Sequence, residues 1–262
     1  MTYKIMNKKL KKIIDEIDTH NHMIRRKLSQ GSENIYDQHV WSVSLYYSFI
    51  GHLKNIVVIL DNPKNLSGIF SLFRSSLDCY INFINVALNY HQYKEYEKDK
   101  LSQTTRLISR IDFNSHTTTQ NRELLKALSH HVEMLKQLDG IKRTYLREKT
   151  KRTNINLPEI ISHFYDLCSE HSHVGHNSLR QYHINKKNNL YYPEQPPIPP
   201  IINVLWSIGI LIGMLQEVTV RVTSDTGFNL NKHNLKKVIQ AIKLCDTYIL
   251  KQLKKYKYPF VE

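Results

Sequence analysis

The sequence predicts an all-α protein built as a single bundle of about seven to nine helices, and three observations support this fold class. The 262 residues include only 8 glycines, too few for repeated tight hairpins. Apolar residues recur every three to four positions over most of the chain, which is the spacing of amphipathic helices. No segment alternates apolar and polar residues as a half-buried strand does.

The first half of the chain contains four predicted helices. They cover about 5–29, 35–60, 66–92 and 121–138. The second ends at the Asp-Asn-Pro of residues 61–63, and a charged segment near 93–116 separates the third from the fourth. The fourth ends at Asp139-Gly140. Its single apolar stripe comprises Leu124, Leu125, Leu128, Val132, Leu135 and Leu138.

The second half begins with a basic linker over 141–153, followed by a helix with Pro158 in its first turn. A proline-rich crossing at 193–200 leads to the last two helices, of which the earlier is strongly apolar. We expect one domain over residues 1–262. Its expected parts are a core of about 35–220 and two basic terminal helices, 5–29 and 229–256, packed on that core.

Positive charge is concentrated in three segments of this chain, whose net charge is +14. Residues 1–30, 142–153 and 232–257 each carry six to eight lysines and arginines against one to three acidic residues. Localised basic surfaces favour polyanions, so RNA or a nucleotide is the expected partner. Two other interpretations stay open: a solvated lysine-rich surface, and basic terminal helices that contact an anionic membrane.

The cysteines and the apolar segments indicate a cytoplasmic protein. Cys79, Cys168 and Cys245 lie far apart and form no Cys-x-x-Cys pair, as expected of reduced, packed thiols. Lysines interrupt the N-terminus too often for a signal peptide. The apolar stretch 201–220 contains polar residues, Glu217 among them, so a buried core helix is expected and no transmembrane segment is predicted.

The segment YDLCSEHSHVGHNSL, which begins at Tyr165, holds three histidines within six positions. On a helix, Tyr165, Ser169 and His173 share one face, with His176 close to the same line. His171 falls instead on the apolar stripe and is expected to be buried. His173 and His176 could share a metal ion, but the spacing marks no third ligand, so neither a metal nor a cofactor is predicted.

An earlier helix carries a polar stripe with one ion pair. The stripe comprises Ser71, Arg74, Asp78, Asn82, Asn85 and Asn89. Asp78 follows Arg74 by one turn, so the two can form an intrahelical salt bridge that orients the guanidinium. Such a stripe commonly faces solvent, but lysine, the usual surface residue of this chain, is missing from it. The stripe therefore predicts a polar seam against another helix.

At these two segments the chain resembles a family of bacterial helical proteins with Arg-x-x-x-acid on one helix and Tyr-x-x-x-Ser-x-x-x-His on a later one. The matching residues are Arg74, Asp78, Tyr165, Ser169 and His173, with Glu170 after the serine. That family is similar to the HEPN superfamily of helical bundles, many of them ribonucleases of toxin–antitoxin, abortive-infection and CRISPR systems. The resemblance covers about residues 35–220 and implies a HEPN-like core.

The chemistry that the resemblance implies is metal-independent RNA cleavage. The ribose 2′-hydroxyl attacks the adjacent phosphate, His173 acts as general acid or base, and Arg74 neutralises charge on the phosphoryl oxygens. Tyr165 and Ser169 orient the imidazole or bind phosphate. His176 and Glu170 are secondary candidates.

The chain departs from HEPN ribonucleases in one important respect. Those enzymes place an arginine four to six residues before the histidine on the same helix, where this chain has Leu167, Cys168 and Ser169. Arg74 must then supply the positive charge across a helix interface. The resemblance also implies a homodimer in which two protomers form one cleft.

Two functions are therefore expected. The first is a HEPN-like endoribonuclease of a toxin–antitoxin or phage-defence system, partnered by a cognate antitoxin or sensor protein. The second is a non-catalytic helical module that binds a nucleotide, RNA or a partner protein. In the second, Arg74, Asp78, Ser169 and His173 form a buried polar network that fixes the register of the helices.

Overall fold

The structure is a computed structural model, and eight helices make up most of the chain that it describes, which confirms the all-α prediction. The described residues are 2–31, 38–61, 68–88, 90–112, 117–142, 158–172, 184–186, 189–191, 201–224 and 232–255. The helices are α1 (Thr2–Gly31), α2 (Gln38–Asp61), α3 (Ile69–Leu88), α4 (Tyr90–Ile108), α5 (Thr118–Gln137), α7 (Pro158–Ser172), α9 (Ile201–Ser224) and α10 (Lys232–Lys255).

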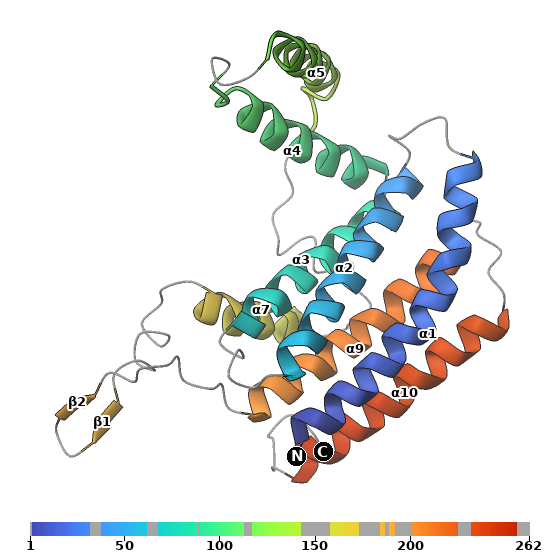
Figure 1. Ribbon diagram of the computed structural model, residues 1–262, viewed down its shortest axis with the longest axis vertical. Helices are drawn as coiled ribbons and strands as arrows, with labels where there is room; N and C mark the ends of the chain where they lie inside the picture. Colours follow the sequence, from blue (N-terminus) through green and yellow to red (C-terminus); the bar gives the residue numbers. More distant parts are fainter. Residues whose placement is uncertain are drawn as a thin grey trace.

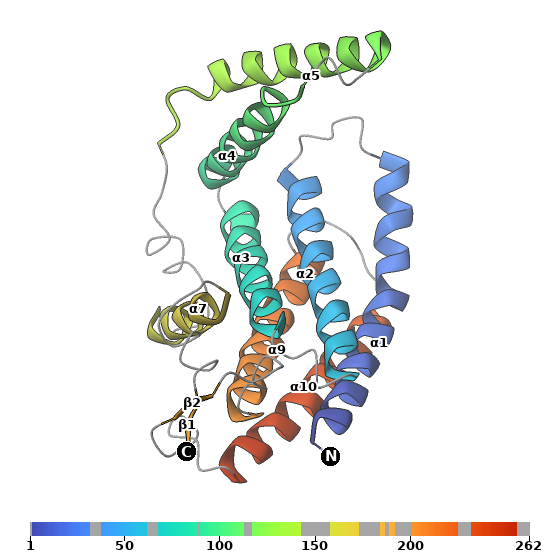
Figure 2. The same ribbon diagram turned by 60° about the vertical axis from the view of Figure 1, so that its left-hand side comes forward.

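The bundle is arranged around α2, α3 and α9. On one side α1 packs against α2 and α10, and on the other side α7 packs against α3 (Figures 1 and 2). The buried side chains of these helices form one continuous apolar cluster. The face of α3 predicted to be apolar lies in this cluster, with Phe70, Phe73, Leu77 and Ile84 almost completely buried.

Helices α2 and α9 are long and apolar enough, by length and composition, to cross a membrane. Here both pack within the bundle, and half or slightly more of each apolar window is buried. Glu217 of α9 accepts a hydrogen bond from Tyr80 Oη at 2.6 Å and another from Arg221 Nε at 3.0 Å. These two hydrogen bonds compensate the free-energy cost of burying a carboxylate in an apolar helix.

The charged segment expected to separate two helices is itself mostly helical, which corrects the prediction for 93–116. Helix α4 begins at Tyr90, directly after α3, which ends earlier than expected. Tyr93, Tyr96 and Leu101 form its buried stripe, and the Tyr96 ring packs edge-on against Trp41 of α2 at 5.5 Å. Two of these three residues are tyrosines, so a search for aliphatic periodicity misses the stripe.

Helix α5 forms as predicted but lies outside the core. A capping box between Thr117 and Gln120 begins it, and none of its residues is buried. Figures 1 and 2 show α4 and α5 as an arm at one end of the molecule, beyond the ends of α2 and α3. The leucine stripe of α5 is therefore only partly covered, by α4 alone among the described elements, and Leu125 and Val132 are 51% and 39% exposed.

A short β-hairpin is present where no strand was predicted. Strands β1 (Ile184–Lys186) and β2 (Asn189–Tyr191) pair antiparallel, with Ile184 opposite Tyr191. Strands of three residues are too short for a recognisable alternation of apolar and polar side chains. The basic linker and the proline-rich crossing lie outside the described residues, apart from the first two residues of the linker.

Gly209 of α9 lies close to Ile249 of α10 and provides a test of the packing. A Cβ atom at this position would lie 3.1 Å from Cγ2 of Ile249. We expect Gly209→Leu to lower the free energy of unfolding by roughly 1–3 kcal/mol, because the extra atoms overpack this contact. Chemical denaturation measures the effect.

Gly213, one turn further along α9, is the matched control. A Cβ atom there meets nothing within 4 Å. Gly213→Ala should raise stability by roughly 0.5–1 kcal/mol, since alanine is the better helix former. Unchanged stability in Gly209→Leu would show that α9 and α10 are not in close contact here.

Candidate functional site

The candidate site lies where α7 packs on α3, and an aromatic cluster holds α7 in place. Ile161, Phe164 and Cys168 form the buried stripe of α7. The Phe164 ring lies 6.3 Å from that of Phe73 on α3 and 5.8 Å from that of Trp206 on α9. The helix begins at Pro158, as predicted. Its buried stripe turns the neighbouring face of α7, with the side chains of residues 165 and 169, toward the polar side of α3.

Arg74 joins the two helices at this interface. Its Nε donates a hydrogen bond to Asp78 Oδ2 at 3.2 Å, the predicted intrahelical pair. Its Nη1 donates to Ser169 Oγ on α7. Cζ of the guanidinium lies 3.1 Å from the centroid of the Tyr165 ring, so the cation stacks on the aromatic face. The predicted polar seam therefore exists, and it brings together four of the residues singled out from the sequence.

The Nη2 edge of the Arg74 guanidinium takes no part in these hydrogen bonds. In the part of the chain that the structure describes, no acceptor contacts Nη2. The side chain keeps 19% of its surface exposed, so Arg74 is not fully sealed from solvent. Asp78 is 47% exposed, and water therefore screens its attraction for the arginine. An arginine held in one orientation with a donor edge available suits a phosphate or carboxylate oxygen.

The surroundings of the cysteine thiols raise their pKa and so make them weak nucleophiles. Burial raises the pKa of the Cys168 thiol well above its ordinary value, an effect that the Arg74 charge partly offsets. Burial, followed by the charge of Asp78, raises the pKa of Cys79 to about 11. Both cysteines are free, as is Cys245, which agrees with the predicted packed thiols. A nucleophilic cysteine needs a lowered pKa, so none of the three fits that role.

His173 and His176, the histidines predicted to take part in catalysis, lie outside the described residues. His173 directly follows Ser172, the last described residue of α7, and His176 lies further along the chain. His171 and Glu170 belong to the last turn of α7, but their side chains are not among those described. The geometry therefore places Arg74, Asp78, Tyr165 and Ser169 together, while the roles of the histidines stay predictions.

The polar stripe of α3 divides between two environments. Asn85 is buried and donates to Ile81 O at 2.7 Å within its own helix, whereas Ser71 is exposed. A second polar cluster, Tyr80 with Glu217 and Arg221, joins α3 to α9 and was not singled out from the sequence. The spacing of Glu217 and Arg221, one turn apart in an otherwise apolar helix, is the signal that could have revealed it.

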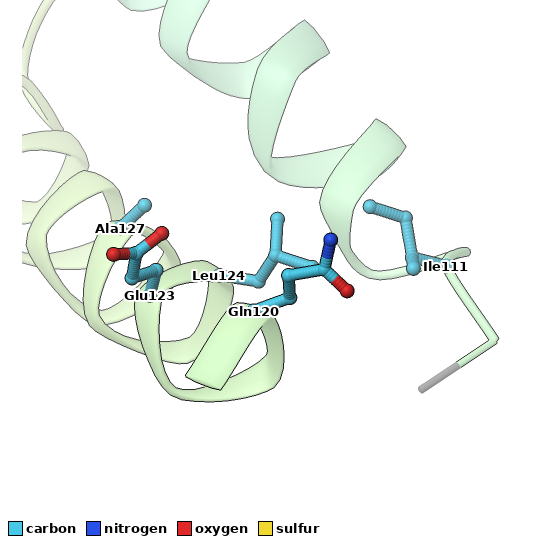
Figure 3. A pocket seen from close by; sticks show the side chains of 5 residues that line it. All are labelled: Ile111, Gln120, Glu123, Leu124 and Ala127. Carbon is cyan, nitrogen blue, oxygen red and sulfur yellow. The ribbon is translucent and has the colours of Figure 1, made fainter. Parts of the chain in front are cut away.

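Other parts of the described chain offer no stronger site. No three histidine, cysteine, aspartate or glutamate side chains among these residues converge to hold a metal ion. An open hollow of about 410 Å³ lies between the end of α4 and the start of α5, where Gln120 and Leu124 face Ile111 (Figure 3). Among the described residues that line the hollow, Glu123 alone is charged, and they lack the convergent polar groups of an active site.

Comparison with known proteins yields a single family. The family model described as "Family of unknown function (DUF5677)" matches residues 39–190, more than half of the chain. The matched range includes α2 to α7 and therefore the whole Arg74 seam. No curated protein and no solved structure matches.

A double-mutant cycle tests the contact between Arg74 and Ser169. We expect Arg74→Ala and Ser169→Ala to show a coupling free energy of roughly 1–2 kcal/mol in unfolding. Either change alone removes the hydrogen bond between the charged arginine and the serine, so the double change should cost less than the sum of the two single changes. Lys54 and Asp18, an exposed pair at 2.7 Å, provide the control cycle, with coupling below about 1 kcal/mol. Equal coupling free energies in the two cycles would contradict the expectation that the Arg74–Ser169 contact is stronger than an exposed ion pair.

Thiol labelling tests the environment of the cysteines. Burial raises the pKa of Cys245 to about 12 and that of Cys79 to about 11. Since the thiolate is the reactive form, alkylation of the native protein at pH 8 should proceed at about one hundredth of the free-cysteine rate or less, and should accelerate as pH rises toward these values. All three thiols should react once the protein is unfolded. Rapid labelling of Cys168 in the native protein would show that the α3–α7 interface opens.

Proposed function

This chain belongs to the DUF5677 family of unknown function, and on that premise we propose that it is a metal-independent endoribonuclease with a HEPN-like helical core. One observation carries the proposal. Arg74 is oriented by Asp78, Ser169 and Tyr165 at a helix interface, with its Nη2 edge available, and His173 follows the same helix α7 in the chain.

In the proposed reaction Arg74 binds the phosphate next to the scissile bond. Its Nη2 donates to a phosphoryl oxygen, and the positive charge stabilises the negative charge that builds up there in the transition state. Tyr165 and Ser169 hold the guanidinium in place, so the arginine does not reorganise as the charge develops. Asp78 keeps the guanidinium plane directed along the seam.

His173 transfers the proton, a role that rests on the sequence pattern. It takes the proton of the ribose 2′-hydroxyl as O2′ bonds to phosphorus and the bond from phosphorus to O5′ breaks. The proton then passes to O5′ of the leaving strand. The products are a 2′,3′-cyclic phosphate and a 5′-hydroxyl end, and no metal takes part. An ordinary histidine pKa near 6.5 suits proton transfer at neutral pH.

A second candidate function is favoured by the same seam. Arg74 already has three partners within the protein and is largely buried, as a purely structural residue would be. In this alternative the chain is a non-catalytic module that binds RNA, a nucleotide or a partner protein, and the seam fixes the register of α7 on α3. Binding of RNA without cleavage, unaffected by His173→Ala, would favour it.

The resemblance to HEPN proteins also implies a cellular role for the proposed ribonuclease. A cytoplasmic ribonuclease of this kind would act as a homodimer in a toxin–antitoxin or phage-defence system, restrained by an antitoxin or a sensor protein. Expression in bacteria, with and without the His173→Ala change, gives a first readout because an active ribonuclease slows growth.

Cleavage of labelled single-stranded RNA by the purified full chain tests the chemistry. With EDTA present we expect the wild-type protein to produce fragments with 2′,3′-cyclic phosphate ends. Arg74→Ala and His173→Ala should each reduce the rate by roughly 100-fold or more, because each removes a group that acts in the transition state.

Two exposed residues of the α4–α5 arm provide matched controls. Arg106→Ala and His130→Ala remove the same side-chain types away from the seam and should retain full activity. Undiminished cleavage in both Arg74→Ala and His173→Ala would rule out this site. Loss of wild-type cleavage in EDTA would instead indicate a metal-dependent reaction.

A further inference from the structure

The two basic terminal helices meet at one end of the bundle. Lys9 of α1 lies over the Tyr248 ring of α10, with Nζ 5.1 Å from the ring centroid. Figures 1 and 2 show the start of α1 and the end of α10 at the same end of the molecule, so the helices run antiparallel. Lys9 and Tyr248, which are neighbours at this end, are 239 positions apart in the chain.

This end of the helix pair presents a lysine-rich surface, which we call the α1–α10 basic surface. Its exposed lysines are Lys4, Lys8, Lys11 and Lys12 on α1 and Lys251, Lys254 and Lys255 on α10. The opposite faces of the two helices are buried, with Leu10 and Ile13 on α1 and Ile249 and Leu253 on α10 among the core residues. The core thus fixes the orientation of the lysines.

Acidic residues are missing from this part of both helices. The first carboxylate of the chain is Asp15, and none occurs between Asp246 and Glu262. Among the described residues of α2, Asp61 reaches this end, where it accepts a hydrogen bond from Asn7. Further along, α1 and α10 do carry Asp15, Glu16, Asp18 and Asp246. The segments with Lys4 to Lys12 and Lys251 to Lys255 therefore carry lysines without a carboxylate, although basic residues also occur further along both helices, such as Arg25 and Lys236.

We propose that the α1–α10 basic surface binds the phosphate backbone of RNA without regard to sequence. Lysines on α1 recur once per turn, about 5.4 Å apart, and form a row of point charges beside those of α10. Such a row suits a polyanion whose charges repeat at short intervals, and it offers no group that reads a base. The choice of RNA rests on the proposed ribonuclease function.

An anionic membrane is the less suitable occupant of this surface. Helices that enter the membrane interface bury a wide apolar face in it, whereas the apolar faces of α1 and α10 are already in the core. On α1 and α10, Ile5 and Leu250 are the large apolar side chains exposed at this end among the described residues, at 39% and 41%, and Val58 near the end of α2 is 67% exposed. Three separate side chains do not make the wide apolar face that insertion requires.

The basic surface and the Arg74 seam lie on different sides of the bundle. Helix α7 packs on α3, while α1 packs on α2 and α10, and α7 lies across the bundle from α1 (Figures 1 and 2). A long RNA can reach both sides, but a dinucleotide cannot. The surface therefore raises affinity for long RNA and has no part in the cleavage step.

Binding of a labelled 20-nucleotide single-stranded RNA to the full chain tests this inference. The measurement uses the His173→Ala background, so that the RNA stays intact, and fluorescence anisotropy over a range of salt concentrations. We expect the triple change Lys8→Gln, Lys251→Gln and Lys255→Gln to weaken binding about 10-fold or more at 0.1 M salt. The slope of log affinity against log salt should become shallower by about 2, since each lost phosphate contact contributes about 0.7 for a single strand.

The matched control removes the same charge at the other end of the molecule. Arg122→Gln, Lys126→Gln and Lys136→Gln change exposed basic residues of α5, and RNA affinity should stay within about twofold of the parent. Equal effects of the two triple changes, or no effect of either, would overturn the inference. So would RNA binding that is unchanged while binding to phosphatidylserine vesicles is lost, because the surface would then serve a membrane.

Cleavage assays separate this inference from the proposed function. In the catalytically intact chain, the Lys8, Lys251 and Lys255 changes should raise KM for long RNA and leave cleavage of a dinucleotide unchanged. Loss of dinucleotide cleavage would place these lysines in the active site and overturn the inference. If the wild-type chain cleaves nothing yet binds RNA through these lysines, the ribonuclease proposal fails and the RNA-binding surface stands.

Discussion

The burial of Phe164 between Phe73 and Trp206 determines where α7 lies, and the candidate site depends on that position. Among the described elements α7 packs mainly on α3, so this aromatic contact provides much of its attachment to the bundle. The stripe formed by Phe164 and Cys168 also sets the rotation of the helix about its axis. Tyr165 and Ser169 are directed at Arg74 because the apolar stripe next to them is buried.

In the proposed reaction Arg74 would have two roles, one structural and one catalytic, which use different N–H groups. Its bonds to Asp78 and Ser169 compensate the cost of placing a cation at a largely buried interface. Those bonds, with the stacking on Tyr165, also hold the guanidinium in one orientation, which a catalytic arginine requires. The Nη2 edge, which no described acceptor contacts, is the part of Arg74 that the proposed reaction uses. The lysines of α1 and α10, which we propose bind RNA, lie on another side of the bundle, away from this edge.

Much of the helical framework could be predicted because helices are determined by local periodicity. The Arg74–Asp78 pair was predictable for the same reason, since residues four apart on a helix always lie close. Helix α4 was missed because tyrosines form its buried stripe among many charges, and the β1–β2 hairpin because each strand has only three residues. The arm formed by α4 and α5 could not be foreseen, since an amphipathic pattern does not say what covers the apolar side.

By itself the sequence determined the fold class, most of the helices, the ion pair within α3 and the two clusters of basic residues near the termini. These are local properties, set by side-chain chemistry within a turn or two of helix. Only the tertiary structure decided that Ser169 and Tyr165 contact Arg74, and that the lysines at the two ends of the chain form one surface. Both depend on how the apolar faces pack in a shared core, which brings together residues that are far apart in the chain.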